Sequence, residues 1–157
     1  MTDVIFQALP TDIVHAYRAG GPDANGMQPE RTICKDDGNP CRHCLQFIAT
    51  GAEMLILAHR PFPSPQPYAE TGPIFLCAAG CPRWEGDGVP PVVIDSKEAR
   101  LIKGYSREDR IVYGLGEIAD PAEVANRART VLDDPRVAYV HERSSTNNCF
   151  SCRIEGG

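Results

Sequence analysis

The stretch Asp120-Pro-Ala-Glu-Val-Ala-Asn-Arg-Ala-Arg-Thr-Val-Leu132 decides the fold class of this chain. Asp120 is a helix-capping residue type, proline suits the first turn, and Glu123 completes the spacing of a capping box. The apolar residues that follow recur at i, i+4, i+7 and i+8, which is the pattern of a helix with one buried face. The stripe that we expect to pack on a sheet consists of Val124, Ala128, Val131 and Leu132.

Short apolar runs on both sides of this helix predict the sheet. A second, smaller helix is expected after residues 10–12, because Ile13, Val14 and Tyr17 would share one face. The predicted strands cover residues 4–9, 32–34, 41–48, 54–59, 74–77, 99–105, 110–113, 136–141 and 150–154, with a hairpin turn at 106–109. We expect six to eight of these candidates to be strands, and with two helices they indicate an α+β fold, with a mostly antiparallel sheet and the helices on one face.

The chain is expected to form a single domain over residues 1–157, a length close to the commonest domain size. Three segments interrupt the regular elements. Residues 20–40 are rich in turn-forming residues and predict a long surface loop, residues 61–67 carry alternating prolines and predict an extended arm, and residues 78–91 predict a further loop.

Charge and hydropathy exclude several classes of partner. The net charge of −5 argues against a nucleic-acid-binding protein, which would carry a basic stripe. The longest apolar runs, such as residues 54–58, are too short to cross a bilayer, and the N-terminus lacks the features of a signal peptide. We therefore expect a cytoplasmic protein without a nucleic-acid or membrane partner. Nothing in the sequence identifies a small-molecule ligand or an oligomeric state.

Seven cysteines are many for such a chain, and four of them form two Cys-x-x-Cys motifs. Zinc is held by four thiolates in a tetrahedron, and two such motifs supply four. The first interpretation is therefore a structural zinc site made by Cys41, Cys44, Cys149 and Cys152, which would hold the last strand against the first third of the chain.

Two other interpretations of these cysteines stay open. Side chains alternate along a strand, so Phe150, Cys152 and Ile154 would share one face, and Cys152 would then be a reduced core thiol. Alternatively, Cys41 and Cys44 form a redox pair, in which the intervening Arg42-His43 would lower a thiol pKa. However, the strand before the motif and the long helix after it, typical of thioredoxin-like proteins, are missing.

The remaining cysteines carry less information. Cys77 ends an apolar strand and is expected to be a core residue. Cys81 precedes a proline in a loop and would reach a metal only together with ligands from elsewhere. The sequence gives no role for Cys34.

Polar residues that follow apolar strands suggest a second kind of site. Side chains at strand ends often line pockets, so an enzyme with a pocket at this edge of the sheet is the alternative function. Its candidate catalytic residues are His141, Arg60, Glu70 and Tyr68, with Asn147 and Asn148 beside them. No phosphate loop, dinucleotide fingerprint or serine-nucleophile motif is present, so the sequence does not decide whether the protein is an enzyme.

Six segments, from Asn39 to Arg153, resemble a known family. They are Asn39-Pro-Cys-Arg-His-Cys-Leu45, Met54-Leu-Ile-Leu-Ala-His-Arg-Pro-Phe62, Gln66-Pro-Tyr-Ala-Glu-Thr-Gly-Pro-Ile-Phe75, Asp109-Arg-Ile-Val-Tyr-Gly114, Asp134-Pro-Arg-Val-Ala-Tyr-Val-His141 and Asn147-Asn-Cys-Phe-Ser-Cys-Arg153. Together they are similar to the bacterial family called domain of unknown function 1203. The resemblance implies no activity, cofactor or partner.

Overall fold

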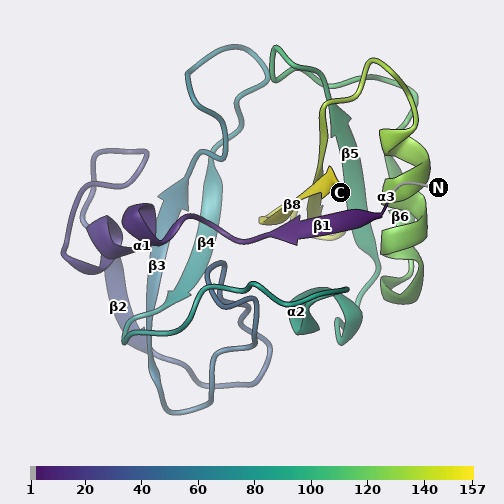
Figure 1. Ribbon diagram of the computed structural model, residues 1–157. Coiled ribbons are helices and arrows are strands. Elements are labelled where there is room, and N and C mark those ends of the chain that lie inside the picture. The colour runs from purple at the N-terminus through teal and green to yellow at the C-terminus, as the bar shows by residue number, and fades with distance from the viewer. Residues whose placement is uncertain (1–2) are drawn as a thin grey trace.

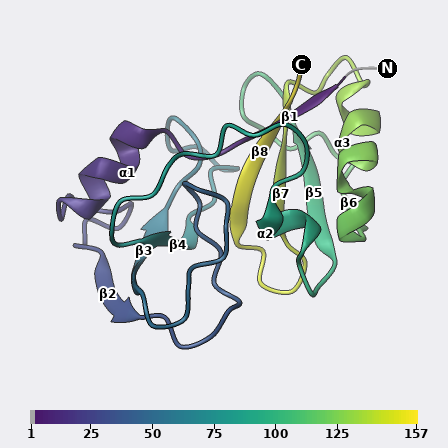
Figure 2. The same ribbon diagram turned by 60° about the horizontal axis from the view of Figure 1, so that its bottom comes forward.

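The computed structural model describes residues 3–157 as an α+β protein with antiparallel strands, as the sequence predicts, but the strands form two sheets and not one. The larger sheet has the strand order β1-β8-β7-β5-β6. Its strands are β1 (Val4–Gln7), β5 (Arg100–Tyr105), β6 (Glu117–Ala119), β7 (Tyr139–Ser144) and β8 (Phe150–Gly156). Since β1 pairs with β8, the first and last described segments of the chain lie side by side (Figure 2).

The smaller sheet contains β2 (Glu30–Ile33), β3 (Glu53–His59) and β4 (Gly72–Cys77), in that order. Helix α1 (Thr11–Arg18) packs on this sheet and buries Val14 in its core. Helix α3 (Val124–Leu132) covers one face of the larger sheet (Figure 1). The two sheets meet where β4 lies against β8. The helices thus cover different sheets, and not one face of a single sheet as the sequence suggested.

The predicted helix of residues 121–132 is present, but it begins differently. A 3₁₀ turn, η1 (Pro121–Glu123), precedes α3, and neither Asp120 nor Glu123 makes a side-chain capping bond. The carboxylate of Glu123 instead accepts a hydrogen bond from the amide of Asn126 at 3.3 Å. The predicted apolar stripe is confirmed, with Val124, Ala128 and Val131 buried.

Two local predictions are wrong, and one short helix was not predicted. Residues 41–48 form a tight turn and not a strand, because their backbone groups bond within the turn. Residues 110–113 make only an isolated bridge, Tyr105 to Ile111, and the neighbours of β5 in the sheet are β6 and β7. The loop of residues 78–91 leads directly into a short helix, α2 (Pro91–Ile94), which the sequence did not predict.

A β-bulge between β7 and β8 changes which way Phe150 faces. Glu142 pairs with Cys152, but the next residue, Arg143, pairs with Phe150, so that Ser151 is the extra residue. Cys152 accordingly packs in the core beneath α3, whereas Phe150 packs with the smaller sheet. The predicted shared face of Phe150 and Cys152 is therefore wrong, because alternation is interrupted at Ser151. Cys152 itself is a core residue, as one interpretation expected.

No helix within residues 3–157 is long and apolar enough to cross a membrane.

Candidate metal centre

The first cysteine pair lies on the tight turn of residues 40–48. The backbone N–H of Leu45 donates to the carbonyl of Cys41 at 3.0 Å, and the N–H of Cys41 donates to the carbonyl of Gln46 at 2.9 Å. Leu45 adopts φ = 54°, a left-handed conformation that usually requires glycine. Its side chain is fully buried in the core, and this burial offsets the strain. Leu45, the residue after Cys44, therefore takes the conformation that the tight turn requires although it is not a glycine.

The second pair comes from the end of β4. Cys77 is the last residue of this strand, and Cys81 follows in the loop after Gly80. A parallel bridge between Cys41 and Phe75 places the end of β4 against the turn of the first pair. The sequence analysis missed this Cys-x-x-x-Cys pair, although its spacing is within the range that zinc ligands use.

The four sulfur atoms lie in a compact cluster. The Sγ atoms of Cys41, Cys44, Cys77 and Cys81 all lie within 4.8 Å of one another, and those of Cys41 and Cys81 are 3.9 Å apart. A tetrahedral ion with Zn–S bonds of about 2.3 Å separates its sulfurs by about 3.8 Å. A disulfide would need about 2.05 Å, and all seven cysteines are free. The cluster therefore has a geometry that can hold a metal ion.

Hydrogen-bond donors surround these sulfurs. The backbone N–H groups of His43 and Cys77 donate to the sulfur of Cys41 at 3.5 Å and 3.4 Å. The guanidinium of Arg18 donates to the sulfur of Cys81 at 3.0 Å and to the carbonyl of Cys77 at the same distance. Such donors stabilise thiolates, and the positive charge of Arg18 reduces the net negative charge of four thiolates around a divalent ion.

His43 lies beside the sulfurs as a supporting residue. It is 1% exposed, and its Nδ1 is 3.3 Å from the sulfur of Cys81 while its Nε2 is 2.9 Å from the hydroxyl of Thr11. Thr11 is the first residue of α1. His43 thus connects the cluster to this helix.

The pKa values of the four thiols are shifted in opposite directions. Hydrogen bonds from Cys44 and Cys77 lower the pKa of Cys41 to about 6. Bonds from Cys41, Cys44 and Cys77, with a further one from His43, lower the pKa of Cys81. The pKa values of Cys44 and Cys77 are raised, mainly through their bonds to Cys41. Metals bind thiolates, and the lowered pKa values of Cys41 and Cys81 favour the thiolate form at these two positions.

The second Cys-x-x-Cys motif lies elsewhere. Cys152 is fully buried on β8, and its sulfur contacts the carboxylate of Glu142 at 3.9 Å. Cys149 lies in the β7–β8 turn, where its thiol is 3.8 Å from the carbonyl of Asn147. The structure therefore brings Cys41 and Cys44 together with Cys77 and Cys81, and places the expected ligands Cys149 and Cys152 in other surroundings.

The residues of the expected enzymatic pocket are partly brought together. His141 is buried among aromatic rings, and burial followed by the charges of Arg143 and Arg153 lowers its pKa well below the usual value. Its Nδ1 lies 3.2 Å from Arg143, whose guanidinium also lies 3.5 Å from the carboxylate of Glu70. Arg143, which the sequence analysis missed, thus connects His141 with Glu70.

The other two candidates lie apart from this group. The side chain of Arg60 donates to the carbonyl of Phe62 at 3.3 Å. The ring of Tyr68 contacts Tyr113 and the guanidinium of Arg110. Asn148 does join the group, since its amide donates to Glu70 at 3.0 Å.

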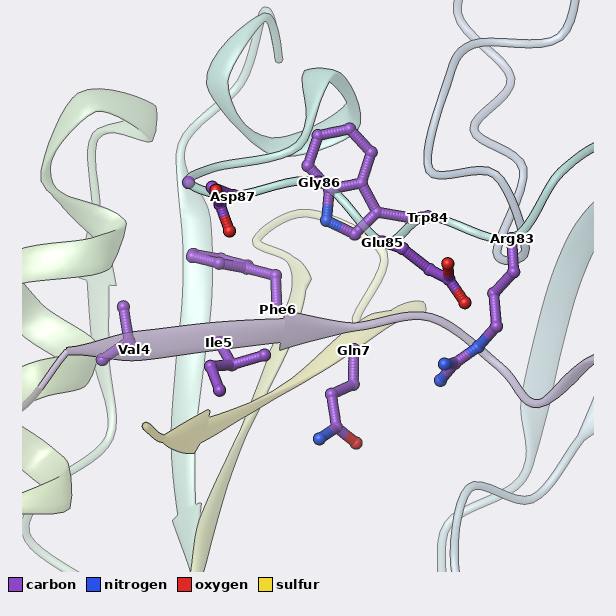
Figure 3. A pocket seen from close by; sticks show the side chains of 10 residues that line it. Val4, Ile5, Phe6, Gln7, Arg83, Trp84, Glu85, Gly86 and Asp87 are labelled. Atoms are coloured by element: carbon purple, nitrogen blue, oxygen red, sulfur yellow. The ribbon is translucent and has the colours of Figure 1, made fainter.

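A separate cavity lies along β1. Its volume is about 320 Å³, and it is bordered by β1 and by residues 83–88 (Figure 3). Arg83 is held there by hydrogen bonds to the carbonyls of Ala8 and Leu9, and the buried Nε1 of Trp84 has no hydrogen-bond partner. None of the site residues expected from the sequence lines this cavity.

The fold and the site define an α+β protein with a four-cysteine cluster that can hold a metal ion. The chain belongs to the family described as "Protein of unknown function (DUF1203)", which matches residues 38–156. The resemblance drawn from six sequence segments is thereby confirmed, and all four clustered cysteines lie within the matched region. No curated protein and no solved structure matches the chain.

Proposed function

We propose that this protein binds one zinc ion through Cys41, Cys44, Cys77 and Cys81, and that the ion is structural. The observation that carries the proposal is the mutual approach of four sulfurs within 4.8 Å. A tetrahedral site made of four thiolates is typical of zinc. Because protein atoms would fill all four positions, no position is open for a substrate or a catalytic water.

The position of the cluster explains what such an ion would stabilise. The turn of residues 40–48 contributes Leu45 to the core of the larger sheet and Ile48 to that of the smaller sheet. The loop after Cys81 bonds back to this turn, since the N–H of Trp84 donates to the carbonyl of His43 at 2.8 Å. Both segments lack a continuous strand ladder. A metal ion would hold them together between the two sheets.

Thiol redox chemistry at Cys41 and Cys44 is less well supported. Reactive cysteines are usually partly exposed to solvent, so that a second thiol can approach. Cys41 is 0% exposed and Cys44 8%. Their neighbours Cys77 and Cys81 also form one group with them, which favours metal coordination over a dithiol pair.

Metal analysis tests the proposal directly. Protein purified without added metal should contain close to one equivalent of zinc, because four-thiolate sites hold zinc tightly. Replacement by Co²⁺ should give the absorption of a tetrahedral thiolate complex. Less than about a tenth of an equivalent of any thiophilic metal, with no cobalt spectrum, would contradict the proposal. One equivalent of iron would show that the four cysteines bind a metal, but that the metal is iron and not zinc.

Arg18 provides a test of the surroundings of the ion. Replacing Arg18 with methionine should weaken zinc binding about 10–100-fold, the usual cost of losing a partner of a metal ligand. The reason is the loss of the bond to the sulfur of Cys81 at 3.0 Å and of its positive charge. Competition with a chromophoric chelator measures the affinity. His15→Gln is the matched control, since His15 is exposed on the same helix, and an equal loss in both variants would refute this role of Arg18.

A further inference from the structure

A small cavity lies between the two sheets, away from the cysteine cluster. It has a volume of about 160 Å³ and lies between the end of β3, the segment that leads into β4, and the β7–β8 turn. The residues of interest that line it are His59, Glu70, Arg143, Asn147, Asn148 and Cys149. The β-bulge at Ser151 shapes this region, because it brings Phe150 to the same face of the sheet as Arg143.

Two buried nitrogen atoms of residues that line the cavity have no hydrogen-bond partner. They are Nε2 of His59 and Nε of Arg143, and the two residues are 6% and 3% exposed. More than about 90% of buried polar groups in proteins are hydrogen-bonded, and an unsatisfied one costs about 1–3 kcal/mol. Two such atoms, on two residues that line one cavity, point to a ligand that accepts hydrogen bonds.

The remaining contacts of Arg143 hold its guanidinium in place. One terminal nitrogen donates to the carbonyl of Asn148 at 3.0 Å and lies 3.5 Å from Glu70, and the other is 3.2 Å from His141. Asn148 adopts φ = 58°, and its N–H bonds to the carbonyl of Ser144 at 2.9 Å, which fixes the turn. The Nε–H is therefore the donor that this arrangement leaves unused.

The hydrogen bonds of His59 assign a similar role to its Nε2. The hydroxyl of Tyr17 lies 2.9 Å from Nδ1 of His59, and burial raises the pKa of Tyr17, so this hydroxyl keeps its proton. Burial, followed by the charges of Arg42 and Arg60, lowers the pKa of His59 to about 4, so the ring is neutral at pH 7. When Tyr17 donates to Nδ1, the ring proton is on Nε2, which then serves as a donor.

The local charge favours an anion. Glu70 is the carboxylate that lines the cavity, and its oxygens already accept bonds from Lys103 at 3.2 Å and from Asn148 at 3.0 Å. Burial alone would raise the pKa of Glu70. The net shift is downward, and the charge of Arg143 is the main cause of the lowering, so this residue is ionised. Arg143 and Lys103 outnumber this single carboxylate, and Arg42 and Arg60 add positive potential at His59.

We propose that this cavity binds the carboxylate or phosphate group of a small molecule, with Arg143 Nε–H and His59 Nε2–H as donors. The volume admits a compact group and not a large cofactor. Asn147 and Asn148 are exposed at the rim, where the rest of the ligand would extend. Cys149 is partly exposed and lines the same cavity, so its thiol reports on occupancy.

The test uses the full-length protein as purified, titrated separately with sodium acetate and sodium phosphate at ionic strength held constant with sodium chloride. Binding should shift the NMR signals of the Arg143 Nε–H and the Asn148 amide in a saturable way. It should also slow alkylation of Cys149 by iodoacetamide, followed by peptide mass spectrometry. A response to acetate alone, to phosphate alone or to both supports the site and identifies which group it accepts.

Two variants separate the site from general effects of charge. Arg143→Lys keeps the charge but removes Nε–H, and His59→Phe keeps a ring but removes Nε2; each should weaken anion binding at least tenfold. Arg153→Lys is the matched control, because Arg153 pairs with His141 across the sheet, stacks on Tyr139, and is not among the residues that line the cavity. Circular dichroism checks that each variant is folded. No saturable response to either anion, or the same affinity in the folded His59→Phe variant, would overturn the proposal. Neither result depends on the zinc content.

Discussion

Replacing Cys81 with serine is expected to abolish tight zinc binding and to lower the melting temperature of the protein by about 10 °C. Losing a thiolate ligand should weaken binding more than about a hundredfold, since even changes to the partners of ligands cost about 10–100-fold. At free zinc 1,000-fold above the dissociation constant, a bound ion contributes about 4 kcal/mol to stability. Removing zinc from the unmodified protein with a chelator should produce a similar drop.

The matched control is Cys149→Ser, which changes a partly exposed thiol outside the cluster. It should retain one equivalent of zinc and nearly the full melting temperature. Metal content and thermal unfolding, with and without chelator, measure both effects. A Cys149 variant that lost zinc, together with a Cys81 variant that kept it, would return the site to the pairing suggested by the two Cys-x-x-Cys motifs.

Replacing Arg100 with methionine is expected to destabilise the protein by about 3–5 kcal/mol, the usual cost of removing one partner of a buried ion pair. Arg100 forms an ion pair with Glu142, which is 0% exposed and pairs across the sheet with the core residues Ile102 and Cys152. Without the guanidinium, this carboxylate would be buried without its compensating charge. Chemical denaturation of the zinc-loaded protein measures the free energy of unfolding.

The double variant Arg100→Met/Glu142→Leu should recover much of the lost stability, because replacing both ions by apolar residues is often neutral or stabilising. Arg31→Met is the control for a general effect of losing an arginine. Arg31 pairs with Glu53 on the surface, where both side chains are nearly half exposed, and such pairs contribute about 0–1 kcal/mol. Equal destabilisation by Arg31→Met and Arg100→Met would show that burial of the pair is not what matters.

Much of the secondary structure follows from local sequence patterns. The alternating and apolar runs predicted β3 and β4, and the helical stripe predicted α3, because these patterns depend only on neighbouring residues. Predictions failed where tertiary contacts decide. The turn of residues 40–48 contains residues that suit a strand, but Leu45 takes a left-handed conformation so that its side chain enters the core. The bulge at Ser151 has no local signal, since it depends on the register with β7.

The spacing of Cys41 and Cys44 already identifies a possible metal-ligand pair, because two ligands three positions apart can share one tight turn. Which thiols complete the group depends on tertiary contacts. The bridge from Cys41 to Phe75 brings the end of β4 to this turn, whereas β8 belongs to the other sheet and buries Cys152 beneath α3. Ligands distant in sequence meet only through strand pairing, and strand pairing depends on the packing of the whole chain.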